Sequence, residues 1–191
     1  LADESKVPIK IRICDTMGYA VPWAEASAPR GVPKMVHAFR HDAGVPAAQL
    51  EWHGHNDFHK TVINSTTAWL HGCASVNGTL MMTGERTGNT PIEAMIFDYI
   101  QLMGDMAGID TTVITDITLY YRDQLGMAIP HNYPFCGSGF NVTMAGIHVD
   151  GVSKDEEIYN IFDTAKLLKR PLGVTITDKS GVAGVAFWIN E

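Results

Sequence analysis

The stretch LEWHGHND, residues 50–57, predicts a β-strand that ends in a metal site. Alternate side chains of a strand lie on the same face. His53 and His55 should therefore lie side by side, while Leu50 and Trp52 face an apolar partner. Two adjacent imidazoles can bind one cation. Considered alone, the octapeptide also fits two ordinary histidines at the end of a strand.

The composition is that of a globular domain with a substantial core. The chain has 191 residues, of which 46% are hydrophobic and 18% charged. A net charge of −7 without a basic run argues against nucleic-acid and anionic-membrane partners. Cys14, Cys73 and Cys136 form no CxxC pair and predict neither a disulfide framework nor a thiolate zinc site. We therefore expect a reducing, cytoplasmic location, and we expect Cys14 to fill the core.

The order strand, polar loop, helix occurs three times in the first 105 residues. The pattern predicts strands at residues 8–16, 50–57 and 74–81, and helices at residues 36–43, 58–72 and 90–104. Such βα units form a parallel sheet, and in (β/α)8 barrels the carboxyl ends of the strands carry the active site. An open doubly wound sheet is the alternative, although no Gly-rich phosphate motif opens a helix.

Capping residues and local composition predict the remaining helices and loops. Asn56 or Asp57 should cap the second helix, and Thr90 the third. A helix is expected at residues 111–125. Residues 129–153 are rich in Pro, Gly, Asn and His and show no clear periodicity, which predicts a lid or linker rather than another barrel unit. Two short helices, at 156–162 and 164–169, and two extended or end segments, at 174–177 and 182–189, should follow.

Two histidines make an incomplete metal site. Asn89, in a glycine-flanked loop after the third strand, is the expected third neighbour. Two neutral imidazoles and an amide oxygen suit Mg²⁺, Mn²⁺ or a similar divalent ion, but the set lacks negative charge. Asp15 and Asp57 could supply that charge, or could instead orient the ligands.

HGHND at residues 53–57, followed by GERTGN at residues 84–89, resembles the signature of the isopropylmalate, homocitrate and citramalate synthases. That family is a metal-dependent, Claisen-condensing family built on a TIM barrel. The 34 positions from His55 to Asn89 match its spacing. DTMG at residues 15–18 and GIHVDG at residues 146–151 resemble further family motifs. The longer segments LEWHGHNDF, TAWLHGCASVNGTL and GERTGNTPIEA are similar to those of the Re-type citrate synthases.

The resemblance implies an α/β fold: the C-terminal part of a (β/α)8 TIM barrel in residues 1–128, followed by a small α/β linker or lid subdomain in residues 129–191. The family's first strand carries an Arg-Asp-Gly motif whose aspartate is the fourth metal ligand. The sequence lacks that motif, since Arg122-Asp123 is followed by Gln124. We therefore expect the chain to be the C-terminal half of the enzyme and to lack full activity alone.

The resemblance also implies a metal site. His53, His55 and Asn89 would bind the catalytic divalent ion, either Mn²⁺ or Mg²⁺, with Co²⁺ or Zn²⁺ as alternatives. Acetyl-CoA would be the co-substrate.

Further roles follow from the same resemblance. Thr16 would contact the α-keto acid, while Glu85 and Arg86 would shape the acetyl-CoA side of the site, with Glu85 catalytic and Arg86 substrate-binding. His148 and Tyr159 would be acid/base or polarising groups brought over the barrel of a partner subunit. Taken alone, Glu85 and Arg86 equally fit a structural ion pair, and His148 fits a solvated loop residue.

The implied function is an acyltransferase that condenses acetyl-CoA with an α-keto acid, with oxaloacetate converted to citrate. The alternatives are an isopropylmalate, homocitrate or citramalate synthase using another keto acid, and a non-catalytic half-barrel that serves as an assembly partner. The lyase branch of the same superfamily is disfavoured by the GERTGN loop. The expected partners are a second copy in a homodimer, or an N-terminal half that carries the Arg-Asp-Gly motif.

Overall fold

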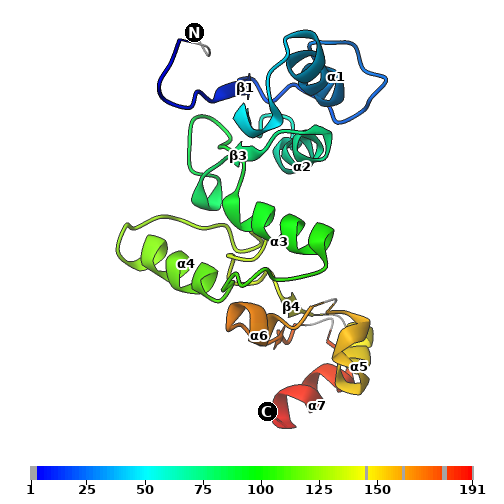
Figure 1. Cartoon of the computed structure of the whole chain (residues 1–191). Helices are drawn as coiled ribbons and strands as arrows, with labels where there is room; N and C mark the ends of the chain where they lie inside the picture. Colours follow the sequence, from blue (N-terminus) through cyan, green and yellow to red (C-terminus); the bar gives the residue numbers. More distant parts are fainter. Residues whose placement is uncertain (1–3, 145, 161, 178–179, 191) are drawn as a thin grey trace. The chain divides into compact units, whose positions relative to one another are not determined.

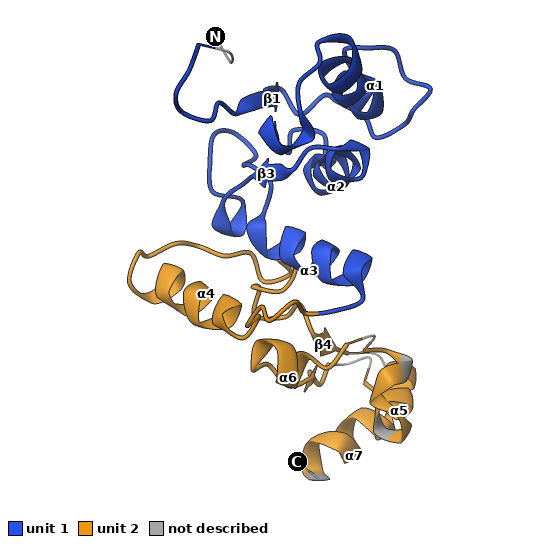
Figure 2. Ribbon diagram, viewed as in Figure 1, with its two compact units in different colours: residues 1–105 blue, residues 106–191 orange. Residues whose placement is uncertain are grey.

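The computed structural model describes residues 4–144, 146–160, 162–177 and 180–190. The chain divides into two compact units, residues 1–105 and residues 106–191 (Figure 2). The predicted boundary between the barrel part, residues 1–128, and the linker part, residues 129–191, stays a prediction.

The first unit is built on a parallel sheet of three strands in the order β1-β2-β3 (Figure 1). The strands are β1(Ile11–Asp15), β2(Leu50–Gly54) and β3(Ser75–Asn77). The α-helices that follow them are α1(Val32–His37), α2(Thr61–His71) and α3(Ile92–Met103). Shorter turns are the π-helical η1(Ala38–Asp42) and the 3₁₀ turns η2(Ala47–Gln49) and η3(Leu80–Met82). The three predicted βα units are therefore confirmed.

The two faces of this sheet differ in character. Leu50 and Trp52 are fully buried and belong to the apolar core, together with Ile13 of β1. The opposite face carries Arg12 and Cys14, and Cys14 is exposed. The expectation that Cys14 fills the core was wrong, because strand alternation places it on the face of Arg12 rather than that of Ile13.

The second helix begins later than predicted. Helix α2 starts at Thr61 and ends at Gly72, whose φ of 113° is left-handed. Lys60 occupies the capping position, so neither Asn56 nor Asp57 is the cap. The Asn56 side-chain oxygen nevertheless accepts a hydrogen bond from the Thr61 N–H at 3.3 Å, so Asn56 still contacts the first turn.

Thr90 does not cap the third helix. Pro91 precedes Ile92 at the helix start and makes no side-chain cap. The Thr90 hydroxyl is buried instead, 2.7 Å from the Thr61 hydroxyl and 2.9 Å from the Ser65 hydroxyl. This hydroxyl cluster joins the start of α3 to α2 and satisfies three buried polar groups at once.

The second unit contains more regular structure than the sequence predicted. Its elements are α4(Val113–Asp123), β4(Val142–Thr143), α5(Gly146–Lys154), η4(Glu156–Ile158), α6(Thr164–Leu168), β5(Gly173–Val174) and α7(Val182–Asn190). Strands β4 and β5 pair in parallel. Residues 129–153, predicted as a lid or linker, include the start of helix α5. The prediction of an extended segment at residues 182–189 was wrong, because these residues are helical.

Helices α5 and α7 pack against each other. Val149 and Val152, three positions apart, are buried on one side of α5. Segment 182–190 is rich in β-branched and aromatic residues, which favour strands by local preference. Contact with a neighbouring helix outweighs that weak preference.

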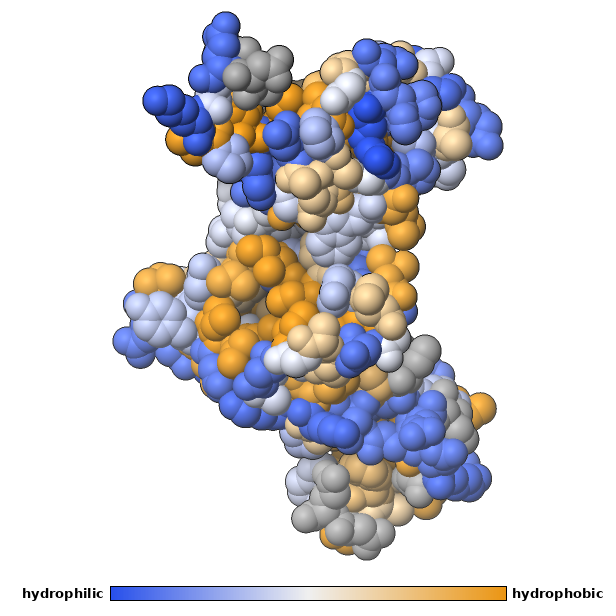
Figure 3. Space-filling view, in the orientation of Figure 1, coloured by the Kyte–Doolittle hydropathy of each residue, from blue (hydrophilic) through white to orange (hydrophobic). Residues whose placement is uncertain are grey.

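Apolar side chains also remain on the surface of both units (Figure 3). They include Leu102 and Met103 of α3 and Val182 and Trp188 of α7. Within the described residues, every helix is too short or too polar to cross a membrane.

Candidate functional site

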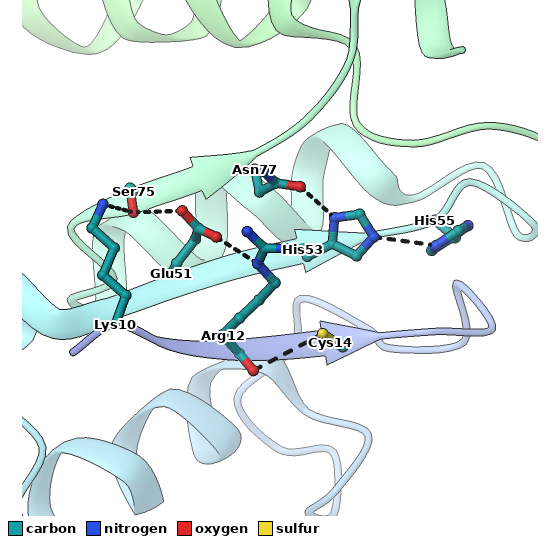
Figure 4. Close-up of polar contacts among 8 residues, drawn as sticks. All are labelled: Lys10, Arg12, Cys14, Glu51, His53, His55, Ser75 and Asn77. Atoms are coloured by element: carbon teal, nitrogen blue, oxygen red, sulfur yellow. Dashed lines mark hydrogen bonds and ion pairs between the residues drawn. The ribbon is translucent and has the colours of Figure 1, made fainter. Parts of the chain in front are cut away.

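The polar face of the three-stranded sheet has two parts (Figure 4). Toward the amino ends of the strands, Arg12 donates to Glu51 at 2.5 Å, and Ser75 lies 3.4 Å from the second Glu51 oxygen. Toward the carboxyl ends lie His53 and its register partner Asn77. In the first part, the charged and hydroxyl groups pair with one another. The second part is the candidate site.

His53 and His55 approach each other as the strand alternation predicts. Their Nε2 atoms are 3.3 Å apart, and the ring planes are inclined at 84°. His55 is 8% exposed, and its backbone forms a bridge to Asn89. Nitrogen ligands bound about 2.1 Å from one cation lie roughly 3 Å apart. The pair therefore has the separation that binding to a single metal ion requires.

Asn89 lies on a loop that is attached to the end of β2. The Thr90 N–H donates to the Gly54 carbonyl at 3.2 Å, and the Asn56 N–H donates to the Gly88 carbonyl at 3.0 Å. Asn89 Oδ1 is buried, and among the described residues it has no hydrogen-bond partner. The same holds for His55 Nδ1. A buried amide oxygen without a partner is costly unless a ligand satisfies it, so this oxygen fits a metal ligand.

The donor set suits a divalent cation but is short of charge. Two imidazoles and one amide oxygen are neutral ligands of the kind that Mn²⁺ and Mg²⁺ accept together with carboxylates. Within the described ranges, no group of three or more His, Cys, Asp or Glu side chains could hold a metal. A carboxylate from outside this group would be needed to complete the coordination.

Asp15, one of the two predicted sources of that charge, is engaged elsewhere. Its carboxylate accepts hydrogen bonds from the backbone N–H groups of Tyr19 at 2.9 Å and Ala20 at 3.2 Å. Burial raises the pKa of the Asp15 carboxyl, while these two hydrogen bonds oppose the shift. The Asp15 side chain therefore fixes the loop that carries Thr16 and Gly18.

Gly18 shows how closely this loop approaches the histidine segment. Its φ is +60°, and a Cβ there would lie 2.7 Å from both the Asp57 nitrogen and the His55 carbonyl oxygen. Glycine is therefore required at the fourth position of DTMG. Thr16, the predicted keto-acid contact, is exposed on the same loop.

Arg86 joins the loops that follow the three strands. Its Nε donates to Asp57 Oδ1 at 2.8 Å, and its Nη2 donates to Asp57 Oδ2 and to the Thr16 carbonyl. The hydrogen bond from Arg86 holds the pKa of the Asp57 carboxyl below its usual value. Asp57 is therefore committed to this ion pair. Glu85 is 83% exposed and lies 3.5 Å from Arg86.

The other two predicted residues lie in the second unit. His148 is on α5, and Tyr159 follows η4. Their ring centroids are 4.9 Å apart, and Tyr159 is 45% exposed. Tyr159 also lines a pocket of about 370 Å³, whose aromatic walls include Phe135, Phe140 and Phe162. His148 and Tyr159 are thus brought together, and His148 lies on a helix rather than on the predicted loop.

Sequence reasoning missed two features of the site. Asn77 lies opposite His53, and Arg86 pairs with Asp57, 29 positions away. A polar residue at the carboxyl end of a strand next to β2 was the available signal for Asn77, because neighbouring parallel strands end at one edge of a sheet.

Comparison with known proteins finds relatives that match the whole length of this chain. The chain is 63% identical over 191 residues to a citrate (Re)-synthase of Syntrophus aciditrophicus (strain SB), covering all of this chain and 30% of that protein. It is 49% identical over 190 residues to a citrate (Re)-synthase of Clostridium kluyveri, again covering all of this chain but 42% of the relative. The chain therefore spans less than half the length of either relative.

A solved structure supports the fold. An HMG-CoA lyase from Acenitobacter baumannii, in complex with coenzyme A and 3-methylmalate, aligns with a TM-score of 0.51 at 21% identity. The alignment covers 63% of this chain and 38% of the lyase. The family model described as HMGL-like matches residues 4–119, which is more than half of the chain. The resemblance predicted from HGHND and GERTGN is confirmed, and the chain belongs to the HMGL-like family of TIM-barrel proteins.

Proposed function

We propose that this chain supplies the metal-binding and keto-acid-binding part of an acyltransferase that condenses acetyl-CoA with an α-keto acid. Oxaloacetate is the preferred acceptor and citrate the product. The observation that carries the proposal is the 3.3 Å approach of His53 Nε2 to His55 Nε2, together with the buried Asn89 oxygen, which has no hydrogen-bond partner among the described residues. The two citrate (Re)-synthase relatives support this choice over the isopropylmalate, homocitrate and citramalate reactions.

The proposed architecture is the C-terminal part of a (β/α)8 barrel, with residues 129–191 as a linker subdomain. Three consecutive parallel strands, each followed by a helix, support the barrel assignment. Their carboxyl ends carry the DTMG, HGHND and GERTGN motifs, where such barrels place their chemistry.

His53, His55 and Asn89 would hold a divalent metal, Mn²⁺ or Mg²⁺. When bound, such an ion polarises the keto-acid carbonyl and stabilises negative charge on its oxygen. The chain's own residues position the substrate around it. Thr16 offers an exposed hydroxyl to the keto acid, on a loop fixed by the Asp15 carboxylate. Arg86 holds that loop through the Thr16 carbonyl.

His148 and Tyr159 are proposed to transfer protons, from the second unit of a partner subunit in a homodimer. A base, for which Glu85 and His148 are candidates, removes a proton from the acetyl methyl group. The methyl carbon bonds to the keto carbon, and the keto oxygen takes a proton to become a hydroxyl. Water then cleaves the thioester and releases the CoA thiol. The contact between the His148 and Tyr159 rings supports their acting as one unit.

A second candidate is a non-catalytic half-barrel that assembles with another polypeptide. One observation favours it: among the described residues, no three His, Cys, Asp or Glu side chains are grouped so that they could hold a metal ion. In that case a partner would supply the ligand that the Arg-Asp-Gly motif provides in the family.

The test measures CoA release with Mn²⁺ and each keto acid in turn, for the chain alone and mixed with a polypeptide that bears the Arg-Asp-Gly strand. We expect the mixture to release CoA fastest with oxaloacetate, and the His53→Ala chain to give none. A mixture that binds metal at His53 and His55 but stays inactive with every keto acid would overturn the synthase proposal and favour the half-barrel.

A further inference from the structure

Asn77 is the last residue of β3 and pairs in register with His53 across the parallel sheet. Both side chains lie on the polar face, and Asn77 Oδ1 is 2.8 Å from His53 Nδ1 (Figure 4). The opposite ring nitrogen of His53, Nε2, points to His55 Nε2. The two nitrogens of one imidazole therefore face an amide oxygen on one side and the candidate metal position on the other.

A neutral imidazole carries one proton, and the hydrogen bond at one nitrogen decides what the other nitrogen can do. An amide oxygen can only accept, so the contact to Asn77 requires a proton on His53 Nδ1. Nε2 is then left with the lone pair that a metal ion needs. We propose that Asn77 is a positioning residue that holds His53 in this tautomer and ring orientation for metal binding. The inference rests on the proposed metal-dependent function.

The two histidines differ in how they are fixed. His53 is held through its Nδ1 by a polar side chain. His55 Nδ1 is buried without a hydrogen-bond partner among the described residues, and the ring is 8% exposed. Close packing fixes His55, whereas the more accessible His53 depends on a directed hydrogen bond. Asn77 should therefore matter more to metal affinity than any other polar neighbour of the pair.

Sheet register makes this role specific to Asn77. Ser75 lies two positions earlier on the same strand and the same face, opposite Glu51. Its hydroxyl contacts Glu51 at 3.4 Å and Lys10 at 3.5 Å, away from either histidine. Ser75→Ala thus removes a polar group from the same face without touching His53, which makes it the matched control.

The first measurement is Mn²⁺ affinity by calorimetry in the native protein. We expect Asn77→Leu and the smaller change Asn77→Ala to weaken binding by about 10–100-fold, the usual effect of losing a hydrogen-bond partner of a ligand. Asn77→Asp should keep at least the original affinity, since a carboxylate also accepts from Nδ1–H. Ser75→Ala should stay within about twofold, which is small against that range.

The second measurement needs neither metal nor activity. Nitrogen NMR of the imidazoles in the metal-free protein should show His53 protonated at Nδ1, and Asn77→Leu should move that proton toward Nε2. An Nε2-protonated His53 in the unaltered protein would overturn the inference. So would equal Mn²⁺ affinity in the unaltered protein, Asn77→Leu and Asn77→Ala. Absence of metal binding in the unaltered protein would instead overturn the proposed function on which the inference rests.

Discussion

The His53–His55 pair of the first unit and the His148–Tyr159 pair of the second unit are held in different ways. In the first unit, His53 and His55 are fixed by a parallel sheet, a register partner and a loop attached to the strand end. In the second unit, His148 and Tyr159 lie on exposed elements, and the described contact between them is one of rings rather than hydrogen bonds. The first cluster has the rigidity that a metal site requires. The second has the accessibility required of groups that meet a substrate from another surface.

The strongest test of this difference is His53→Ala. We expect Mn²⁺ binding to be lost, by more than about 100-fold, because a ligand lost from a rigid site affects affinity more than a lost supporting contact. His148→Ala should bind the ion normally in the same titration. Unchanged affinity in His53→Ala would mean that the metal site is misplaced.

Gly88→Ala tests whether the loop before Asn89 must follow its observed path. A Cβ at Gly88 would lie 1.9 Å from the Met82 carbonyl oxygen, at a φ of +91°. We expect a loss of stability of about 1–3 kcal/mol from backbone strain, together with weaker metal binding as Asn89 shifts.

The matched control for Gly88→Ala is Gly104→Ala. Gly104 has a φ of +68°, with no atom within 4 Å of the added Cβ. This substitution should cost about 1 kcal/mol or less and leave metal binding unchanged. Equal effects of the two changes, measured by thermal unfolding and calorimetry, would contradict a special role for the Gly88 contact.

Arg86→Leu should loosen the loops without removing a metal ligand. Arg86 holds the pKa of Asp57 below its ordinary value of 3.8. The stabilisation from this pair is therefore fully present above about pH 4 and is lost as the pH falls through the lower, folded-state pKa. The difference in unfolding free energy between the original chain and Arg86→Leu should thus shrink on acidification.

Hydrogen exchange should show faster opening near Thr16 and Asp57 in Arg86→Leu. Arg122→Leu is the control, since Arg122 pairs with its sequence neighbour Asp123 at 2.6 Å and joins no separate loops. A stability difference that does not change with acidification would show that Arg86 does not lower the pKa of Asp57.

The smallest effect on structure is expected from Tyr159→Phe. The ring is 45% exposed, and the change removes a hydroxyl only. Unfolding free energy should stay within about 0.5 kcal/mol, as for most surface substitutions, and metal affinity should not change. A marked loss of either would show that the second cluster is as structurally fixed as the first.

Local pattern was sufficient to predict much of the first unit. The alternation of Leu50 and Trp52 with His53 and His55 predicted the strand, its buried face and the approach of the imidazoles. The link between Asn77 and His53 depends on strand register, which no local pattern carries. The Arg86–Asp57 pair joins separate loops for the same reason.

The second unit was harder to predict because tertiary contact decides its structure. Helix α7 is rich in residues that favour strands, and its packing against α5 overrides that preference. The segment GIHVDG begins and ends with glycine. Its sequence alone did not indicate a helix in which Val149 is buried.

The hydrophobic cluster packed on the three-stranded sheet has a consequence for the order of folding during synthesis. The hydrophobic cluster around Leu50 and Trp52, from Ile11 to Val76, precedes Asn77 in the chain. A growing chain folds its earlier domains first, at about 5–20 residues per second. The sheet that aligns His53 with His55 can therefore close before the second unit is synthesised. Asn89 emerges about one second after Asn77 at that rate, so a half-formed site precedes the complete set of ligands.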